Sequence, residues 1–281
     1  MELTADEIDG YRSYVGRKVT DVDFIDDRIV VQFSATFDVP MPDHLLPHMW
    51  HYGLFTPSTP TAKLDTDGHP RRGDFMPPVK LPRRMFAGST LKFLAPLKIG
   101  QKVSRTAEIA SVEHRLGRTG HLVFVGAASR LSQEDRLCVE ELQTIVYREA
   151  SATKMPPVKP ASINHAATNE VATAWRPTAT QLFRYSAITF NSHRIHYEER
   201  YATDVEGYPD LVVHAPLIAT QLCKFAEQIA PRRILQFTFR GEAPCFVNQE
   251  LKLIAQLSQN SVALHAERQD GVIAMSAEAR C

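Results

Sequence analysis

Residues 184–217 hold the side chains whose types and spacing best suit proton-transfer chemistry. This stretch, RYSAITFNSHRIHYEERYATDVEGYPDLVVHAPL, carries Tyr185, Asn191, His193, Arg194, His196 and His214. Polar turn residues flank 195–197, so the chain can bend there and aim His196 into a pocket. An imidazole with a pKa near 6.5 can both take up and release a proton at neutral pH. His196 is therefore a candidate general acid and base, and a structural histidine is the alternative.

The end of this stretch predicts the start of a buried helix. Pro216 directly precedes the apolar run LIATQLCKFAEQIA, and proline in a first turn costs no hydrogen bond, so we expect a helix over about 216–229. Its free N–H groups and partial positive charge would suit an oxygen that acquires negative charge. The backbone near Ala215 is thus a candidate oxyanion site.

The rest of the chain predicts a few helices and many antiparallel strands. A capping box at Thr4 and Glu7 predicts a helix within 2–15. Apolar alternation predicts a strand in 20–39, and a helix is expected at 44–55. The Pro-, Gly- and Asp-rich stretch 57–82 predicts a long loop, and a loop of this length inside a compact domain is usually functional or mobile. Further strands are expected at 88–95, 102–115, 119–132, 137–147, 178–184, 233–241, 249–257, 260–268 and 271–279.

An internal repeat indicates two similar halves. Ala95-Pro96 and Gln101 recur as Ala243-Pro244 and Gln249, each 148 positions later (243 − 95). In both places the dipeptide follows one expected strand and the glutamine opens the next. The intervening segment 150–171 is rich in Ala, Pro and Ser, so we expect a linker there. Each half would be an antiparallel sheet curled around one helix, an α+β fold.

The motif region resembles the MaoC-like (R-specific) enoyl-CoA hydratase family, whose pattern is Asp-x-Asn-Pro-x-His. This chain has Asn191-Ser192-His193-Arg194-Ile195-His196, so the histidine matches and three other positions depart. This form of the motif is similar to that of the branch containing mesaconyl-C4-CoA and itaconyl-CoA hydratases and type 2 hydroxyacyl-thioester dehydratases. Two further stretches resemble the same branch, HMWHYGLFTP (48–57) and LPRRMFAGSTLKFLAPLKIGQ (81–101).

The resemblance implies a double hotdog and an enoyl-thioester hydratase. Residues 1–149 would be a degenerate hotdog that shapes the acyl and CoA tunnel, and 172–281 the catalytic hotdog. His196 would carry the proton transfers while Asn191, in place of the family's aspartate, positions the water. Alternatively Asn191 is a turn residue, and Glu198 or Asp204 supplies the base.

Several other residues are candidate substrate ligands. Arg194, or less directly Arg184, would bind a second carboxylate of a dicarboxylic acyl group. His193 would hydrogen-bond His196 or the loop backbone. The remaining candidates are Tyr185, His214 and Trp50 at the acyl group, each with packing as the alternative, and Arg84 and Arg240 at the CoA phosphates.

Composition narrows the class of protein. The chain has 281 residues with 32 basic and 32 acidic side chains, and no basic tract, so nucleic acid is an unexpected partner. No apolar run approaches a membrane span, and the N-terminus is polar. Four scattered cysteines without a CxxC pair suit free thiols in a reducing cytoplasm. No HExxH, Cys–His cluster or nucleotide-binding glycine motif occurs, so we expect neither a metal nor a separate cofactor.

We therefore expect a cytoplasmic homo-oligomeric lyase that reversibly hydrates a short, branched dicarboxylic enoyl-CoA, such as itaconyl-CoA or mesaconyl-C4-CoA. The first alternative is a 3-hydroxyacyl-thioester dehydratase that acts on acyl carrier protein. The second is a non-catalytic hotdog that binds acyl thioesters, which the loss of the aspartate at Asn191 would favour.

Overall fold

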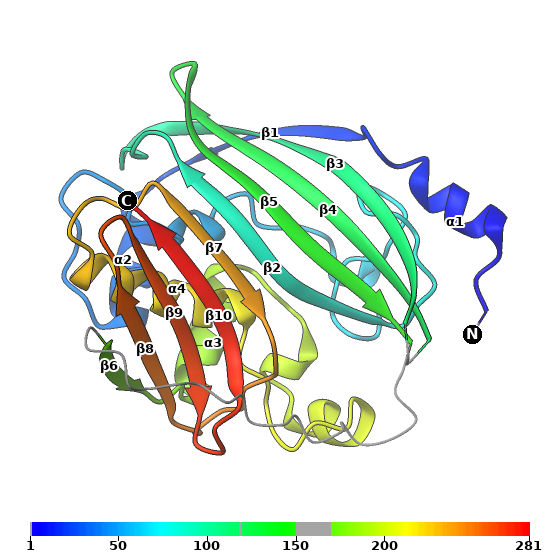
Figure 1. Ribbon diagram of the computed structural model, residues 1–281. Coiled ribbons are helices and arrows are strands. Elements are labelled where there is room, and N and C mark those ends of the chain that lie inside the picture. Colours follow the sequence, from blue (N-terminus) through cyan, green and yellow to red (C-terminus); the bar gives the residue numbers. More distant parts are fainter. Residues whose placement is uncertain (1, 118–119, 150–169) are drawn as a thin grey trace.

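A single antiparallel sheet of ten strands dominates the computed structural model, which describes residues 2–117, 120–149 and 170–281. The strands follow the order β1-β3-β4-β5-β2-β7-β10-β9-β8-β6 (Figure 1). Their bounds are β1 Lys18–Phe24, β2 Arg83–Phe93, β3 Lys102–Gly117, β4 Gly120–Gln133, β5 Arg136–Arg148, β6 Glu170–Trp175, β7 Gln236–Gly241, β8 Leu251–Leu257, β9 Ser261–Arg268 and β10 Ile273–Arg280. The α+β double-hotdog prediction is confirmed.

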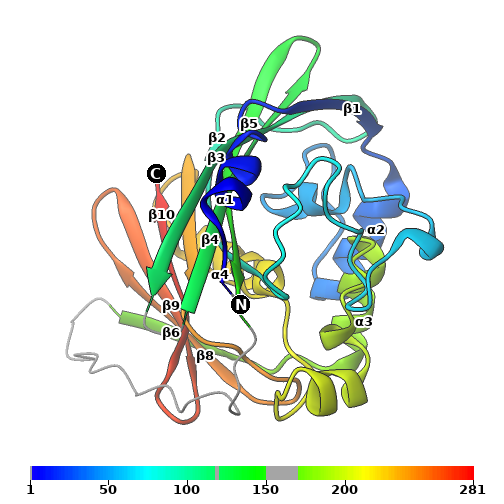
Figure 2. The same ribbon diagram turned by 90° about the vertical axis from the view of Figure 1, so that its right-hand side faces the viewer.

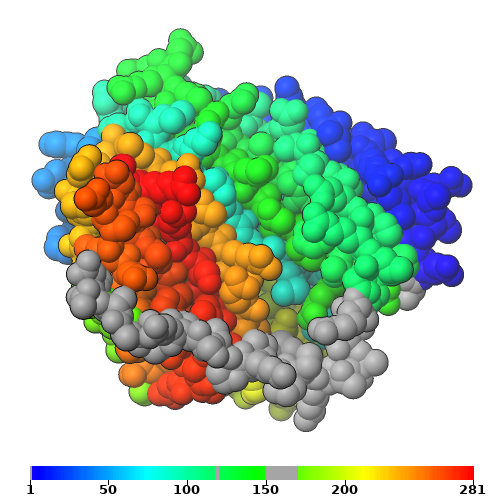
Figure 3. All heavy atoms as spheres, viewed as in Figure 1, coloured from blue at the N-terminus to red at the C-terminus, as the bar shows by residue number. Residues whose placement is uncertain are grey.

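The two half-sheets join where β2 pairs with β7. Thr90 lies opposite Thr238 in that pairing, and these two residues are 148 positions apart (238 − 90), the spacing of the sequence repeat. Outward from this pair the strand order is the same in both halves, with β1 at one edge and β6 at the other. On the outer face the halves form one continuous surface (Figure 3). The structure thus has the internal symmetry that the repeat indicated.

Four α-helices accompany the sheet in the described part of the chain: α1 Ala5–Arg12, α2 Asp27–Phe37, α3 Ala179–Ile188 and α4 Ala215–Ile229. The capping box of α1 is present as predicted, with Thr4 accepting from the Glu7 N–H and Glu7 accepting from the Thr4 N–H. Helix α4 begins at Ala215 with Pro216 in its first turn. It lies against the concave face of the sheet, and α2 and α3 lie on its other side (Figure 2). The prediction for α4 was correct to within one residue.

Three predicted elements are wrong. The expected strand at 20–39 is strand β1 followed by helix α2, because Asp26 caps a helix by accepting from the Ile29 N–H at 2.9 Å. The expected strand at 178–184 is helix α3, capped by Thr178. The expected helix at 44–55 is a single 3-10 turn, η1 Trp50–Gly53, which Met49 precedes with a φ of 70°. The other short helical turns are η2 Thr61–Lys63, η3 Arg194–His196 and η4 Tyr201–Val205.

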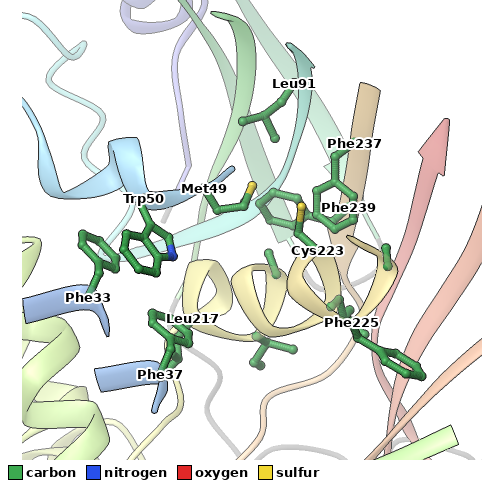
Figure 4. Close-up of a cluster of buried hydrophobic side chains, with 14 of the residues drawn as sticks. Phe33, Phe37, Met49, Trp50, Leu91, Leu217, Cys223, Phe225, Phe237 and Phe239 are labelled. Carbon is green, nitrogen blue, oxygen red and sulfur yellow. The ribbon is translucent and has the colours of Figure 1, made fainter. Parts of the chain in front are cut away.

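The first half, as far as the structure describes it, therefore lacks a counterpart of α4. The main hydrophobic core gathers on the α4 side instead, where Phe237 and Phe239 of β7 lie beside Cys223 and Leu217 lies beside Phe37 (Figure 4). Trp50 stacks on Phe33 with ring centroids 5.2 Å apart and is buried in this core. All four cysteines are free thiols. Within the described ranges no helix has both the length and the apolar character needed to cross a bilayer.

Candidate active site

A cavity of about 2180 Å³ lies between the two halves. Its apolar wall includes Ala107, Ala127 and Ile145 from the half-sheet that lacks a long helix. Its polar wall comes from the motif loop (residues 189–214, between α3 and α4), the start of α4, the loop at 57–82, and side chains of η1, β2, β5 and α3. The polar lining includes His51, Tyr52, Asp67, His69, Arg84, Glu141, Tyr185, Asn191, His193, His196 and His214. The cavity is therefore where side chains from both halves converge.

His196 ends the 3-10 turn η3 and is 8% exposed. Its Nδ1 lies 2.7 Å from the Val212 carbonyl oxygen, and the Val212 N–H donates to the Ile195 carbonyl oxygen at 2.9 Å. The carbonyl can only accept, so Nδ1 carries the proton and Nε2 has the lone pair. Burial lowers the pKa of His196 to about 4, so the ring is neutral at neutral pH. This neutral imidazole can act as a proton acceptor.

His214 forms the second fixed imidazole of the site. Its ring stacks on that of His196, with centroids 3.7 Å apart and an interplanar angle of 20°. Its Nε2 lies 2.8 Å from the Ser186 hydroxyl oxygen. Burial, reinforced by the neighbouring His196 and His193, holds the pKa of His214 well below its ordinary value. Stacking between two neutral rings therefore restricts the orientation of His196.

The backbone at the start of α4 faces the cavity beside these rings. His214 is the N-cap residue, and Ala215 and Pro216 of the first turn both line the cavity. Pro216 has no N–H, and the Leu217 and Ile218 N–H groups donate to the His214 carbonyl oxygen at 3.0 and 3.1 Å. The Ala215 N–H is therefore the first-turn donor that remains for a ligand. The structure thus brings the predicted oxyanion backbone and His196 to one cavity.

Asn191 also lines the cavity, although its side chain forms a local turn. Its Oδ1 accepts from the His193 N–H at 3.0 Å, and its own N–H donates to the Ser186 carbonyl oxygen at 2.8 Å. This Asx turn uses the amide oxygen that would otherwise contact a water.

The loop at 57–82 is hydrogen-bonded to the motif loop. The Arg194 N–H donates to the Asp67 carbonyl oxygen at 2.9 Å, and the Ser192 hydroxyl donates to the Gly68 carbonyl oxygen. These contacts place His69 beside His193, with ring centroids 4.2 Å apart. His193 in turn lies edge-on to His196, with centroids 5.3 Å apart. A row of imidazoles therefore runs from the first-half loop to the start of α4.

Comparison with known proteins gives the family. The model of the hydroxyacyl-thioester dehydratase type 2 family matches residues 49–247. The chain belongs to this family. It is similar to the mesaconyl-C4-CoA hydratase of Chloroflexus aurantiacus, with 40% identity over 273 residues that cover 95% of this chain and 96% of that protein.

A further relative and a solved structure are also similar to this chain. The mitochondrial type 2 hydroxyacyl-thioester dehydratase of Schizosaccharomyces pombe is 27% identical over 231 residues, 73% of this chain and 75% of that one. HtdX of Mycobacterium tuberculosis shares the fold, with a TM-score of 0.67 at 18% identity, over 94% of this chain and 99% of that chain. This member of the dehydratase family is a hydro-lyase, so a non-catalytic binding module is not supported.

Four predicted ligands of this family member lie outside the cavity. The Arg194 guanidinium forms a two-pronged contact with Glu198, at 2.7 Å for each nitrogen–oxygen pair, and stacks over Tyr201. Arg184 donates to the Ala35 carbonyl oxygen at 2.9 Å. The two others are Trp50, which is buried in the core, and Arg240, which is 77% exposed beside Glu242.

Glu198 and Asp204, the alternative candidates for the general base, also lie outside the cavity. Glu198 is the partner of Arg194, and Asp204 accepts from the Thr203 hydroxyl at 3.0 Å. By contrast Tyr185, His193, His214 and Arg84 do line the cavity.

Sequence reasoning missed polar residues that the first half contributes. Glu141 of β5 is 6% exposed and accepts from the Tyr52 and Ser89 hydroxyls, each at 2.7 Å. Burial alone would raise the pKa of Glu141, but the adjacent His51 and these hydroxyls lower it. The signal was that Glu141 occupies an inward-facing position of the strand, next to Glu140. For Asp67 and His69 the signal was the DGH sequence within a loop already expected to be functional or mobile.

Proposed function

We propose that this hydro-lyase reversibly hydrates a short, branched dicarboxylic enoyl-CoA. Mesaconyl-C4-CoA is the leading substrate, because the Chloroflexus relative that carries that name is 40% identical over nearly the whole chain. Itaconyl-CoA belongs to the same substrate class. In mesaconyl-C4-CoA the free carboxylate sits on the β-carbon, which is the carbon that takes up the hydroxyl. A cation is therefore needed close to the proton-transfer group.

Arg84 carries this proposal. Its guanidinium lines the cavity, and its charge helps to lower the pKa of both His69 and His193. Five other arginines line the cavity. Three of their side chains have partners: Arg72 donates to the Val79 and Leu81 carbonyl oxygens, Arg83 pairs with Glu206 at 3.0 Å, and Arg105 pairs with Asp21 at 2.6 Å. For the Arg84 guanidinium the described residues offer no ion pair or hydrogen bond. An unpaired guanidinium beside the imidazoles can bind a carboxylate in a two-pronged contact.

The chemistry assigned to His196 follows from its free Nε2. This nitrogen takes a proton from water, the water oxygen bonds to the β-carbon, and the alkene electron pair moves toward the thioester. The charge on the thioester oxygen is stabilised by the Ala215 N–H, at the positive end of α4. The α-carbon then takes the proton from His196. No metal or separate cofactor is needed for these steps.

In this proposal the two halves have different roles, catalysis in one and substrate binding in the other. Residues 172–281 supply the proton-transfer group and the oxyanion site. Residues 1–149 shape the acyl and CoA tunnel, because the small and apolar side chains of β3, β4 and β5 line the cavity on that side. Arg84 then belongs to the acyl group and not to the CoA phosphates.

Assembly and location complete the proposal. We expect a homo-oligomer in the cytoplasm, and β1 offers an edge on which Val22 is 68% and Phe24 47% exposed. Light scattering coupled to gel filtration measures the assembly, and a monomer at micromolar concentration would contradict this part.

The deciding experiment compares three thioesters in wild type, Arg84→Met and Arg240→Met. We expect the wild type to turn over mesaconyl-C4-CoA and itaconyl-CoA in preference to crotonyl-CoA. Loss of a charged hydrogen bond is worth about 1.5–3 kcal/mol, so Arg84→Met should lower kcat/KM for the dicarboxylic substrates about 10- to 100-fold. Its rate with crotonyl-CoA should be unchanged. Arg240→Met, at an exposed arginine outside the cavity, should match the wild type.

A second function has its own support. The family model and the fission yeast relative are named for hydroxyacyl-thioester dehydration. Wild-type preference for crotonyl thioesters, with no effect of Arg84→Met, would favour that function. Faster turnover of the thioester on acyl carrier protein than on CoA would identify the carrier.

A further inference from the structure

Asp67 and His69 form a carboxylate–imidazole pair in the cavity wall, outside the sequence motif. Asp67 Oδ1 accepts from the His69 N–H at 2.8 Å, and Asp67 Oδ2 lies 3.1 Å from His69 Nδ1. Their side chains are only 17% and 21% exposed. Both residues come from the loop at 57–82, more than 120 positions before His196.

The contact with Asp67 sets the tautomer of His69. Burial alone would raise the pKa of Asp67, but the hydrogen bonds and charge of His69 outweigh burial and lower it. An ionised carboxylate can only accept, so His69 Nδ1 carries the proton and Nε2 has the lone pair. Burial is the largest cause of the lowered pKa of His69, so its ring is neutral at neutral pH. His69 thus presents a hydrogen-bond acceptor in a cavity that His196 also lines.

The pair is held rigidly against the motif loop. The Arg194 N–H donates to the Asp67 carbonyl oxygen, and Arg194 Nη1 donates to the Thr66 carbonyl oxygen at 2.8 Å. Gly68, between the two residues, has a φ of +91°, and a Cβ there would lie 1.9 Å from the Ser192 carbonyl oxygen. Such a close approach between two loops is possible only with glycine.

The family's acidic position cannot supply the same acceptor here. Asparagine replaces aspartate at 191, and its Oδ1 already accepts from the His193 N–H. His69 is close enough to His196 for its charge to contribute to the lowered pKa of His196. The first half therefore contributes His69, oriented by the Asp67 carboxylate, as a hydrogen-bond acceptor in the cavity. Position 191 of the motif, where the family has an aspartate, no longer carries a carboxylate.

We propose that His69, oriented by Asp67, binds and polarises the attacking water together with His196. This role rests on the proposed hydration reaction. One hydrogen of the water goes to His196 Nε2, and the oxygen forms the bond to the β-carbon. The other hydrogen stays on the product hydroxyl and is hydrogen-bonded to His69 Nε2. His196 returns its proton to the α-carbon, so both imidazoles end neutral. His69 is then a catalytic residue and Asp67 a positioning residue.

A metal is the competing occupant of the same place. Ligand atoms of Asp67, His69 and His193 lie within 4.8 Å of one another. Two observations favour the water-binding role. Both Asp67 oxygens are engaged by N–H groups of His69, and the unpaired charge of Arg84 acts on both histidines. A nearby guanidinium raises the cost of placing a divalent cation there.

The test measures kcat, KM, thioester binding and thermal unfolding for Asp67→Asn, His69→Ala and the control Asp65→Asn. In Asp67→Asn the side chain has one oxygen for two N–H groups, so its amide would donate to His69 Nδ1 and move the imidazole proton to Nε2. We expect Asp67→Asn and His69→Ala each to lower kcat about 100-fold, with KM and the unfolding temperature little changed. Added imidazole should restore part of the rate in His69→Ala alone. Asp65 is exposed and lies outside the cavity, so Asp65→Asn should keep the wild-type rate.

Each contrary result has a distinct meaning. Variants with wild-type kcat would overturn the role of the pair and leave the proposed hydration intact. Loss of rate together with loss of thioester binding, without rescue by imidazole, would make the pair structural and also overturn the role. Wild-type activity that chelation abolishes and zinc restores would make the three residues a metal site. A wild type that hydrates no enoyl thioester would overturn the proposed function itself.

Discussion

His196 and His214 lie face to face at the start of α4, with their ring centroids 3.7 Å apart. Each ring is held by a hydrogen-bond partner of its own, His196 by the Val212 carbonyl and His214 by the Ser186 hydroxyl. The stack thus fixes an imidazole beside the first turn of α4, where the Ala215 N–H is available. The proposed proton acceptor and the proposed oxyanion donor line one cavity, although the two histidines are eighteen positions apart in the sequence (214 − 196).

Replacing His196 tests whether this stacked ring does the proton transfer. General acid–base catalysis by a side chain contributes about 10²- to 10⁴-fold, so His196→Gln should lower kcat by that factor. KM should change little, because His196 is not assigned to binding. His114→Gln is the matched control, since His114 lies on β3 outside the cavity. A His196→Gln enzyme within a few-fold of wild type would remove His196 from the mechanism.

The pH profile provides an independent test. Burial lowers the pKa of His196 to about 4, and the reaction needs its neutral form. The quantity kcat/KM reports ionisations of the free enzyme, so it should stay flat from neutral pH to about pH 5 and fall near pH 4. An acidic limb centred near 6.5, the pKa of an ordinary histidine, would show that the group that titrates is exposed and is not His196.

Stability should also depend on pH, with a predictable sign. The pKa values of His196 and His214 are lowered in the folded state, so the unfolded chain binds more protons once the pH falls below about 6.5. Unfolding is therefore favoured as the pH decreases from 6.5 toward 5, by up to about 1.4 kcal/mol per pH unit for each histidine. Urea unfolding at pH 7, 6 and 5 measures this slope. His214→Asn should flatten it, whatever its stability at pH 7, and an unchanged slope would contradict the prediction.

Local patterns predicted the elements whose signals lie within one segment. The capping box gave α1, and Pro216 with the apolar run after it gave α4. Helix α2 was missed because Ile29, Val30, Phe33 and Phe37 were interpreted as strand alternation. Their spacing places them on one buried helical face, and the Asp26 cap starts the helix.

Some site residues could likewise be predicted from neighbouring sequence, whereas others depend on contacts between segments that are distant in sequence. His196, Asn191 and Ala215 are close in sequence, and the motif brought them to one cavity. The roles of Arg194 and Arg84 could not be separated without the fold. Glu198 lies one helical turn from Arg194 and captures its charge, whereas Arg84 lies on the distant strand β2. Asp67 and His69 reach the motif only through contacts between the two halves, which no local pattern encodes.

Gly68 provides the sharpest test of that contact between the halves, with Gly73 as its control. Both glycines have a left-handed φ, +91° and +110°, so alanine strains the backbone at either position, by about 1 kcal/mol or more. Only at Gly68 does the added Cβ collide with the motif loop, 1.9 Å from the Ser192 carbonyl oxygen. At Gly73 the nearest atom, Pro78 Cβ, is 3.6 Å away. We expect both substitutions to lower the unfolding temperature, Gly68→Ala more than Gly73→Ala because the collision adds to the strain.

The two variants should differ in activity. Gly68→Ala must push the loop that carries Asp67 and His69 away from Ser192, because the colliding atom belongs to the backbone and cannot rotate aside. Assayed well below its unfolding temperature, it should lose at least about 10-fold in kcat, the effect expected when positioned groups shift by about 1 Å. Gly73→Ala should keep nearly the wild-type kcat under the same conditions. Equal activity in the two variants would mean that the contact between the loop at 57–82 and the motif loop does not position groups for the reaction.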